Sequence, residues 1–136
     1  MLTPADRTAP SPAQPHTGMV TLINSFEVPT SREAAFEAMW HAMAAWFRAQ
    51  PGYVSNRLHR AVSPNAQYRF VNVVQWRSEA EYQAAHRSPE FLRQVQAPEW
   101  QEFPNRPALY EVVVDANAEG GISLDRTSTG VAASAR

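Results

Sequence analysis

The spacing of apolar residues alternates along the chain between a strand-like period of two and a helix-like period of about 3.6, and the order of these segments most constrains the fold. Apolar residues recur at every second position in residues 20–28, 53–62, 68–76 and 108–115, which predicts four β-strands. Helical spacing of apolar residues separates the first strand from the second, and the third from the fourth. The order β-α-β-β-α-β predicts a ferredoxin-like α+β fold, with one antiparallel sheet and helices on one face.

Capping signals mark where the predicted helices begin and end. Residues 30–33 (Thr-Ser-Arg-Glu) and 78–81 (Ser-Glu-Ala-Glu) have the pattern of capping boxes, and 88–90 (Ser-Pro-Glu) fits a further helix start. The pair Pro51-Gly52 ends the first helix. That helix carries one apolar face, formed by Phe36, Met39, Trp40, Met43, Trp46 and Phe47.

If all helices cover one face of the sheet, the opposite face is left bare. The apolar residues that the alternation places there are Ile23, Val54, Leu58, Val71, Val73 and Val113. A monomer seldom leaves such a patch in water. We therefore predict a homodimer in which two sheets pack face to face about a two-fold axis.

Composition and charge narrow the range of partners. The formal net charge is −1, without a basic stripe, so nucleic-acid binding is not expected. No apolar run approaches the roughly 20 residues needed to cross a bilayer, so no membrane partner is expected. The chain has no cysteine, which fits a reducing, cytoplasmic location. Residues 1–18 and 116–136 are rich in proline or in small polar residues and predict disordered tails, which leaves one domain over residues 19–115.

Motif searches exclude several types of site. The sequence lacks GxGxxG, GxxxxGK[ST], GxSxG and HExxH, so nothing indicates a nucleotide, a flavin or a catalytic serine. The four histidines, His16, His41, His59 and His86, are not at metal-ligand spacing, and no metal site is expected.

Two asparagines interrupt the apolar strand face that the helices should cover. Asn24 lies between Leu22 and Phe26, and Asn72 shares the corresponding face of its strand with Trp76. A buried carboxamide is costly unless it is hydrogen-bonded. Each asparagine could simply satisfy a neighbouring backbone group. Two on one buried face also fit a mostly aromatic pocket that needs a few polar groups.

These residues belong to a stretch that resembles a known family. Residues 72–78 (Asn-Val-Val-Gln-Trp-Arg-Ser), followed by Tyr82 and by 88–91 (Ser-Pro-Glu-Phe), are similar to the hallmark stretch of antibiotic-biosynthesis monooxygenase domains. The opening strand with Asn24, the Pro51-Gly52-Tyr53 junction and the closing Tyr-Glu-Val-Val also match, so the resemblance covers about residues 19–115. It implies a dimeric α/β barrel.

One branch of this family consists of cofactor-independent oxygenases that convert anthrones or naphthacenones to quinones. The resemblance implies a catalytic set of four residues, Asn72, Trp76, Asn24 and Tyr82. We further expect the substrate, a small aromatic molecule, to be bound with O2 beside Phe26, Phe70, Trp40 and His86. His86 is also a possible base, because an unperturbed histidine titrates near neutral pH. Some members carry an arginine near position 96, where this chain has Gln96, with Arg93 one turn earlier.

A second branch degrades haem and shares the asparagine at Asn24. That branch uses an axial histidine and a tryptophan, and the corresponding positions here are Val95 (or Gln94) and Ala85. His86 only neighbours the tryptophan position, so the haem iron has no obvious ligand. Haem is therefore ranked second, as the alternative cofactor. A non-catalytic dimer that binds a small ligand is the remaining hypothesis, because the fold hosts many activities.

Overall fold

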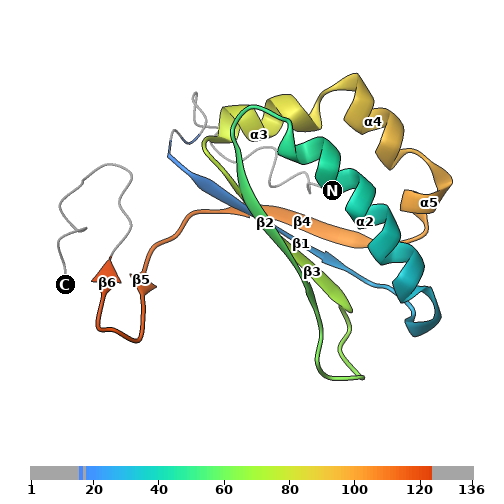
Figure 1. Ribbon diagram of the computed structural model, residues 1–136, viewed down its shortest axis with the longest axis horizontal. Helices are drawn as coiled ribbons and strands as arrows, with labels where there is room; N and C mark the ends of the chain where they lie inside the picture. The colour runs from blue at the N-terminus through green and yellow to red at the C-terminus, as the bar shows by residue number, and fades with distance from the viewer. Residues whose placement is uncertain (1–15, 17, 124–136) are drawn as a thin grey trace, which may run out of the picture.

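A four-stranded antiparallel sheet forms the base of the molecule (Figure 1). The computed structural model describes residue 16 and residues 18–123. The strands are β1 (Val20–Phe26), β2 (Tyr53–Arg60), β3 (Phe70–Trp76) and β4 (Asn105–Tyr110). Their spatial order is β2-β3-β1-β4, so the first and third strands form the centre of the sheet. The predicted ferredoxin-like fold is confirmed.

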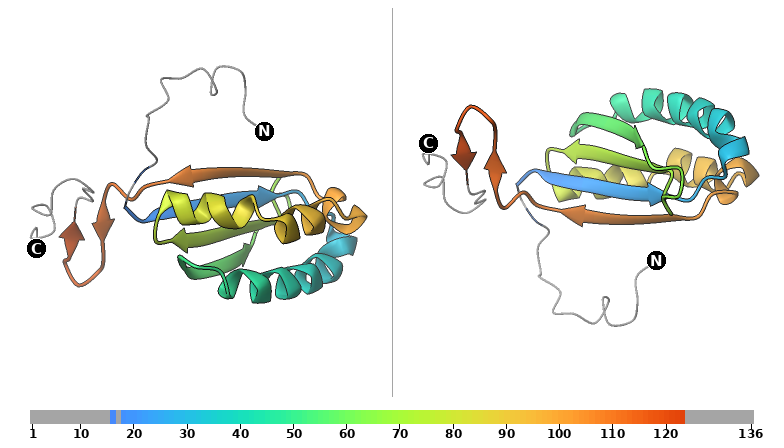
Figure 2. Two further views of the ribbon diagram at one scale, coloured as in Figure 1. Left: turned by 90° about the horizontal axis from the view of Figure 1, so that it is seen from above. Right: turned by 90° about the horizontal axis from the view of Figure 1, so that it is seen from below.

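The helices cover a single face of this sheet, as Figures 1 and 2 show. They are the short 3-10 helix η1 (Thr30–Arg32), α2 (Glu33–Arg48), α3 (Glu79–His86), α4 (Pro89–Val95) and α5 (Pro98–Gln101). The sequence did not predict α5. None of the helices in the described part of the chain is long and apolar enough to cross a membrane.

An aromatic core joins α2 to the sheet. Phe36 is fully buried and lies between Phe26 at a ring-centroid distance of 4.9 Å and Phe70 at 4.7 Å. Phe103, which precedes β4, packs edge-on against the same ring at 5.3 Å. These contacts hold α2 at one end of the sheet, and Phe26 also borders the space that remains between the helices and the rest of the sheet.

The first predicted capping box is wrong, whereas the other two helix starts are confirmed. The side chains of Ser78 and Ser88 accept hydrogen bonds from the backbone N–H groups of Glu81 and Phe91. The helix α2 instead begins through η1 without a side-chain cap. The carboxylate of Glu33, which a capping box would require, forms ion pairs with Arg69 at 3.2 Å and Arg60 at 3.8 Å.

A β-bulge in β2 changes which of its residues face the helices. The pairing with β3 shifts between Tyr53 and Ser55, so Val54 is the extra residue. Beyond the bulge, Leu58 lies opposite Asn72 and packs against the core. The prediction that Leu58 lies on the bare face is therefore wrong.

The last strand begins and ends earlier than predicted. Tyr110 pairs with Thr21, next to the first residue of β1, so β4 has no partner beyond this point. Val113 consequently lies outside the sheet and is 56% exposed. Residues from 116 onward were predicted as a tail, but a small hairpin of β5 (Asp115–Ala116) and β6 (Ile122–Ser123) follows instead. The remaining parts of the predicted tails, 1–15, 17 and 124–136, lie outside the described residues.

Candidate active site

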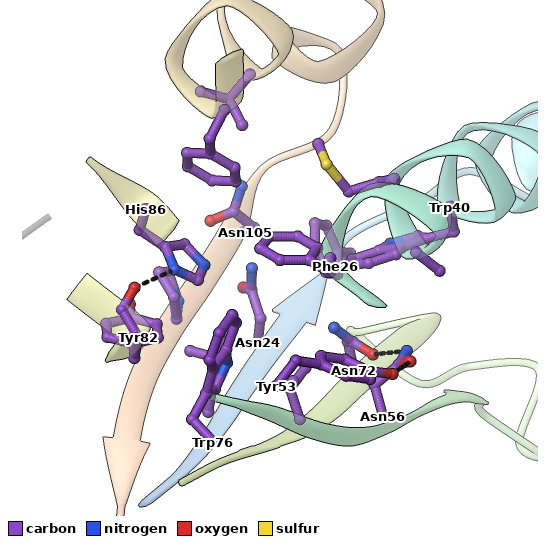
Figure 3. A pocket seen from close by; sticks show the side chains of 18 of the residues that line it. Asn24, Phe26, Trp40, Tyr53, Asn56, Asn72, Trp76, Tyr82, His86 and Asn105 are labelled. Carbon is purple, nitrogen blue, oxygen red and sulfur yellow. Dashed lines mark hydrogen bonds between the residues drawn. The ribbon is translucent and has the colours of Figure 1, made fainter. Parts of the chain in front are cut away.

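A cavity of about 370 Å³ lies between the sheet and the helices (Figure 3). Its walls come from all four long strands and from α2, α3, α4 and α5. The residues that line it are Leu22, Asn24, Phe26, Trp40, Met43, Ala44, Phe47, Tyr53, Asn56, Asn72, Val74, Trp76, Tyr82, His86, Phe91, Val95, Trp100, Asn105 and Pro107. Lysine, arginine, aspartate and glutamate are missing from this lining. A few polar groups in an aromatic wall are typical of a small-molecule site.

Each strand of the sheet contributes one asparagine to the cavity. The four are Asn56 from β2, Asn72 from β3, Asn24 from β1 and Asn105 from β4. Asn24 lies directly opposite Asn72 in the antiparallel register, so the two side chains are neighbours on the same face. The result is a row of carboxamides across the floor of the cavity.

A chain of hydrogen bonds runs along one end of this row. The Tyr53 hydroxyl donates to Oδ1 of Asn56 at 2.5 Å, and Nδ2 of Asn56 donates to Oδ1 of Asn72 at 3.2 Å. Asn72 is only 1% exposed. Within the described residues no hydrogen bond engages its Nδ2, which points away from Asn56 toward the middle of the cavity in Figure 3.

Three further polar atoms of the lining are buried without a partner in the described structure. They are Oδ1 of Asn24 and the indole Nε1 atoms of Trp40 and Trp76. An unpartnered buried polar atom costs free energy, so such atoms usually have a role or a missing partner. The residues that carry them line the cavity, so one potential acceptor and two potential donors lie beside it.

His86 and Tyr82 lie together at the end of the cavity formed by α3. Nδ1 of His86 is 2.8 Å from the carbonyl oxygen of Tyr82, and because a carbonyl only accepts, this nitrogen carries the proton. Within the described residues no hydrogen bond engages Nε2, whose lone pair can therefore accept a proton. Burial lowers the pKa of His86, although the bond to the Tyr82 carbonyl partly opposes this, and burial with the nearby Glu79 charge raises the pKa of Tyr82.

The structure brings most of the predicted site residues together. Those that line the cavity are Asn24, Asn72, Trp76, Tyr82, Phe26, Trp40 and His86. Phe70 does not: it is 2% exposed and stacked on Phe36, outside the cavity wall. Its ring instead packs in the core between α2 and β3.

Several lining residues were not predicted from the sequence. Asn56 and Tyr53 reach the cavity because of the bulge at Val54, which no sequence pattern reveals. Asn105 precedes the predicted start of the last strand at residue 108, whereas β4 begins at Asn105 itself. Trp100 lies on the unpredicted α5, and the preceding Ala-Pro-Glu could have indicated this helix start.

Metal-binding side chains are not clustered in the part of the chain that the structure describes. No group of three or more histidine, aspartate or glutamate residues lies close enough there to hold a metal ion. His86 is the one cavity-lining residue with an imidazole.

Comparisons with known proteins agree with this architecture. The family model for antibiotic biosynthesis monooxygenase matches residues 19–97. A provisionally named monooxygenase of Shewanella loihica is 38% identical, with a TM-score of 0.59 over 71% of this chain and 95% of that one. SnoaB, a cofactor-independent oxygenase from Streptomyces nogalater, is 26% identical, with a TM-score of 0.60 over 70% of this chain and 93% of that one.

A haem-degrading protein from Mycobacterium tuberculosis shares the fold, at 23% identity and a TM-score of 0.56 over 74% of this chain and 97% of that one. The comparison with curated proteins gave no significant match. The family match covers more than half of the sequence, and it spans β1 to α4, which carry most of the residues that line the cavity. The chain belongs to the antibiotic biosynthesis monooxygenase family.

Proposed function

We propose that this protein is a cofactor-independent monooxygenase that oxidises an electron-rich phenolic or polycyclic substrate, such as an anthrone or a quinol, to a quinone with O2. The cavity supports a flat aromatic substrate because its walls are mainly aromatic and aliphatic. It reaches from Trp76 to Asn72, four residues apart on β3, which corresponds to about 13 Å of strand. An elongated fused-ring molecule fits such a space better than a small acid.

The proposed reaction begins with removal of a proton from the substrate. Nε2 of His86 takes a proton from the reacting CH2 carbon, which leaves a delocalised anion. This anion transfers one electron to O2, and the resulting radical and superoxide combine through a new carbon–oxygen bond. The peroxide is protonated, the second C–H proton leaves, and the O–O bond breaks. One oxygen atom of O2 becomes the quinone carbonyl and the other leaves as water.

In this reaction the protein has to stabilise negative charge and exclude water. Asn72 supplies an amide N–H that no hydrogen bond within the described residues engages. Trp76, which is fully buried, supplies an unpartnered indole N–H. Fixed donors aimed at developing charge are more effective in a dry site than in water. Asn24 offers a buried acceptor for a substrate hydroxyl. Tyr82, with its raised pKa, stays protonated and can donate to a substrate carbonyl.

The observation that carries the proposal is the row of carboxamides facing an uncharged aromatic cavity beside a free imidazole nitrogen. It predicts that Asn72→Ala lowers turnover of the anthrone dithranol by roughly ten- to a thousand-fold, because one oxyanion donor is lost. Oxygen uptake and the absorbance of the quinone product measure this. Leu92→Ala, on the exposed side of α4, is the control. Failure of the wild-type protein to accelerate oxidation of any anthrone or quinol in air would refute the proposal for these substrates.

Haem is the second candidate, and the free Nε2 of His86 is the observation that favours it. The hydrogen bond from Nδ1 to the Tyr82 carbonyl is the kind of contact that orients a metal-binding imidazole. When bound, haem would supply the iron at which O2 is activated. A titration followed at the Soret band separates the two candidates. Saturation at one haem per subunit, lost in His86→Gln, would favour haem degradation, whereas we expect no stoichiometric complex.

A further inference from the structure

We propose that Tyr53 and Asn56 are positioning residues that hold Asn72 as a hydrogen-bond donor toward the substrate. The inference rests on the proposed function, because the donor is needed where negative charge develops. Neither residue was part of the site predicted from the sequence. Both reach the cavity through the bulge at Val54, which turns Tyr53 and Asn56 to the same face although they are three residues apart.

The lengths of the two hydrogen bonds define the direction of the chain. The contact between the Tyr53 hydroxyl and Oδ1 of Asn56 is 2.5 Å, which lies at the short end of the range for O–H···O and outside the range for N–H···O. Tyr53 therefore donates and the amide oxygen of Asn56 accepts. Nδ2 of Asn56 is then directed toward Asn72 and donates to its Oδ1 at 3.2 Å. Burial raises the pKa of Tyr53, so its proton stays in place at neutral pH.

The consequence for Asn72 is a fixed amide orientation. A carboxamide that rotates by 180° exchanges its oxygen and its nitrogen with almost no change in shape. In the rotated state Oδ1 would face the cavity and repel an oxyanion. With Oδ1 held by Asn56, the Nδ2 group is the one that faces the cavity, as Figure 3 shows. The opposing Asn24 forms no hydrogen bond to this amide within the described residues, so Asn56 is the neighbour that selects the orientation.

The variant Asn56→Asp reverses this arrangement with almost no change in volume. A carboxylate at this position still accepts from Tyr53 but also accepts from Nδ2 of Asn72, which turns the oxygen of Asn72 into the cavity. We expect kcat for dithranol to fall roughly a hundred-fold near pH 8, similar to the effect of removing the donor. On acidification the introduced carboxyl becomes protonated and can donate to Oδ1 of Asn72. The ratio of variant to wild-type kcat should therefore rise again at low pH.

Two further variants separate orientation from charge and from folding. Asn105→Asp introduces the same charge into the same cavity, but its side chain forms no bond to Asn72 in the described structure. Tyr53→Phe removes only the hydroxyl donor, and we expect a kcat loss of about ten-fold, with Tm measured for each variant. A loss in Asn56→Asp no larger than in Asn105→Asp, or one that acidification does not reverse, would overturn the positioning role.

A binding experiment tests the same inference without turnover. The probe is 9,10-anthraquinone, whose carbonyls only accept hydrogen bonds, and binding is followed by quenching of tryptophan fluorescence. We expect the affinity of Asn56→Asp near pH 8 to be about ten-fold weaker than that of the wild type, with recovery at low pH. If the wild-type protein binds the quinone but oxidises no anthrone, the proposed function fails. The comparison of anthraquinone affinities then still decides whether Asn56 positions Asn72. Equal affinity in both proteins would contradict the positioning role.

Discussion

Burial keeps the polar groups of the site uncharged while leaving each of them able to donate or accept. The amides of Asn24 and Asn72 carry no charge at any pH, and the raised pKa of Tyr82 keeps its phenol protonated. The lowered pKa of His86 keeps its imidazole neutral near pH 7. The cavity would thus carry no charge before the reaction, and proton transfer would create the substrate anion together with the imidazolium of His86. Such a site can accept a proton at one point and stabilise the resulting anion at others.

The neutral state of His86 predicts a specific pH dependence. Because its pKa lies below the usual 6.5, the base should remain active at pH 6.5, and kcat/KM should decline only at lower pH. His86→Gln should lower kcat/KM at pH 7 by roughly a hundred-fold or more. It should also remove the decline of kcat/KM at low pH, the acidic limb of the pH profile. Rates of dithranol oxidation between pH 5 and 8 measure both effects. The exposed His41→Gln is the control, and a limb that persists in His86→Gln would show that another group is the base.

The same pKa shift also affects stability. The unfolded chain binds a proton on this histidine near pH 6.5, whereas the folded protein does so only at lower pH. The contribution of His86 to stability is therefore present in full above pH 6.5 and is lost as the pH falls toward the folded pKa. The decrease in Tm over this range should be smaller in His86→Gln than in the wild type.

At the scale of the element, α3 is fixed by its first turn. The Ser78 hydroxyl accepts from the backbone N–H of Glu81 and donates to its carboxylate at 3.0 Å, and Arg77 pairs with the same carboxylate. Gly52, with φ of +89°, passes so close to Glu81 that an added Cβ would lie 2.5 Å from that side chain. These contacts join α3 to the start of β2. They determine where Tyr82 and His86 enter the cavity.

Two of the three serine or threonine residues that the sequence marks as caps, Ser78 and Thr30, should respond differently to substitution. Ser78→Ala removes a formed cap and should lower the free energy of unfolding by about 1 kcal/mol. Thr30→Ala is the matched control and should change it by less than about 0.5 kcal/mol, because the Thr30 side chain caps no helix. Urea unfolding of both variants measures the difference. Equal losses would contradict the role assigned to the Ser78 side chain.

The elements that the sequence predicts well are those in which the alternation of apolar and polar residues is uninterrupted. The strands β1 and β3 alternate regularly, so the face shared by Asn24, Asn72 and Trp76 could be read directly from their spacing. The bulge in β2 is different, because Val54-Ser55 continues the alternation and only the pairing with β3 reveals the extra residue. The last strand was misplaced because Pro107 disfavours a strand, whereas the three valines at 112–114 favour one. Pro107 is tolerated because β4 is an edge strand.

At the scale of the whole molecule, none of the described helices covers the face of the sheet opposite the cavity (Figure 2). The register places Ile23 between Val73 and Ala108 at its centre, and Tyr110 at its edge is 51% exposed. The linker at residues 112–114 adds three exposed valines beside it. A second copy of the chain, related by a two-fold axis, would cover such a surface on both subunits at once.

We therefore predict that the protein is a homodimer with more than about 1,000 Å² buried in total. Sedimentation at micromolar concentration should give twice the subunit mass of 15.2 kDa. Val73→Lys, at the centre of the uncovered face, should shift the mass toward one subunit because a charge would have to be buried between the sheets. Leu92→Lys places the same charge on the exposed side of α4 and should leave the dimer intact. A wild-type mass of one subunit under these conditions would contradict the predicted interface, and circular dichroism checks that both variants are folded.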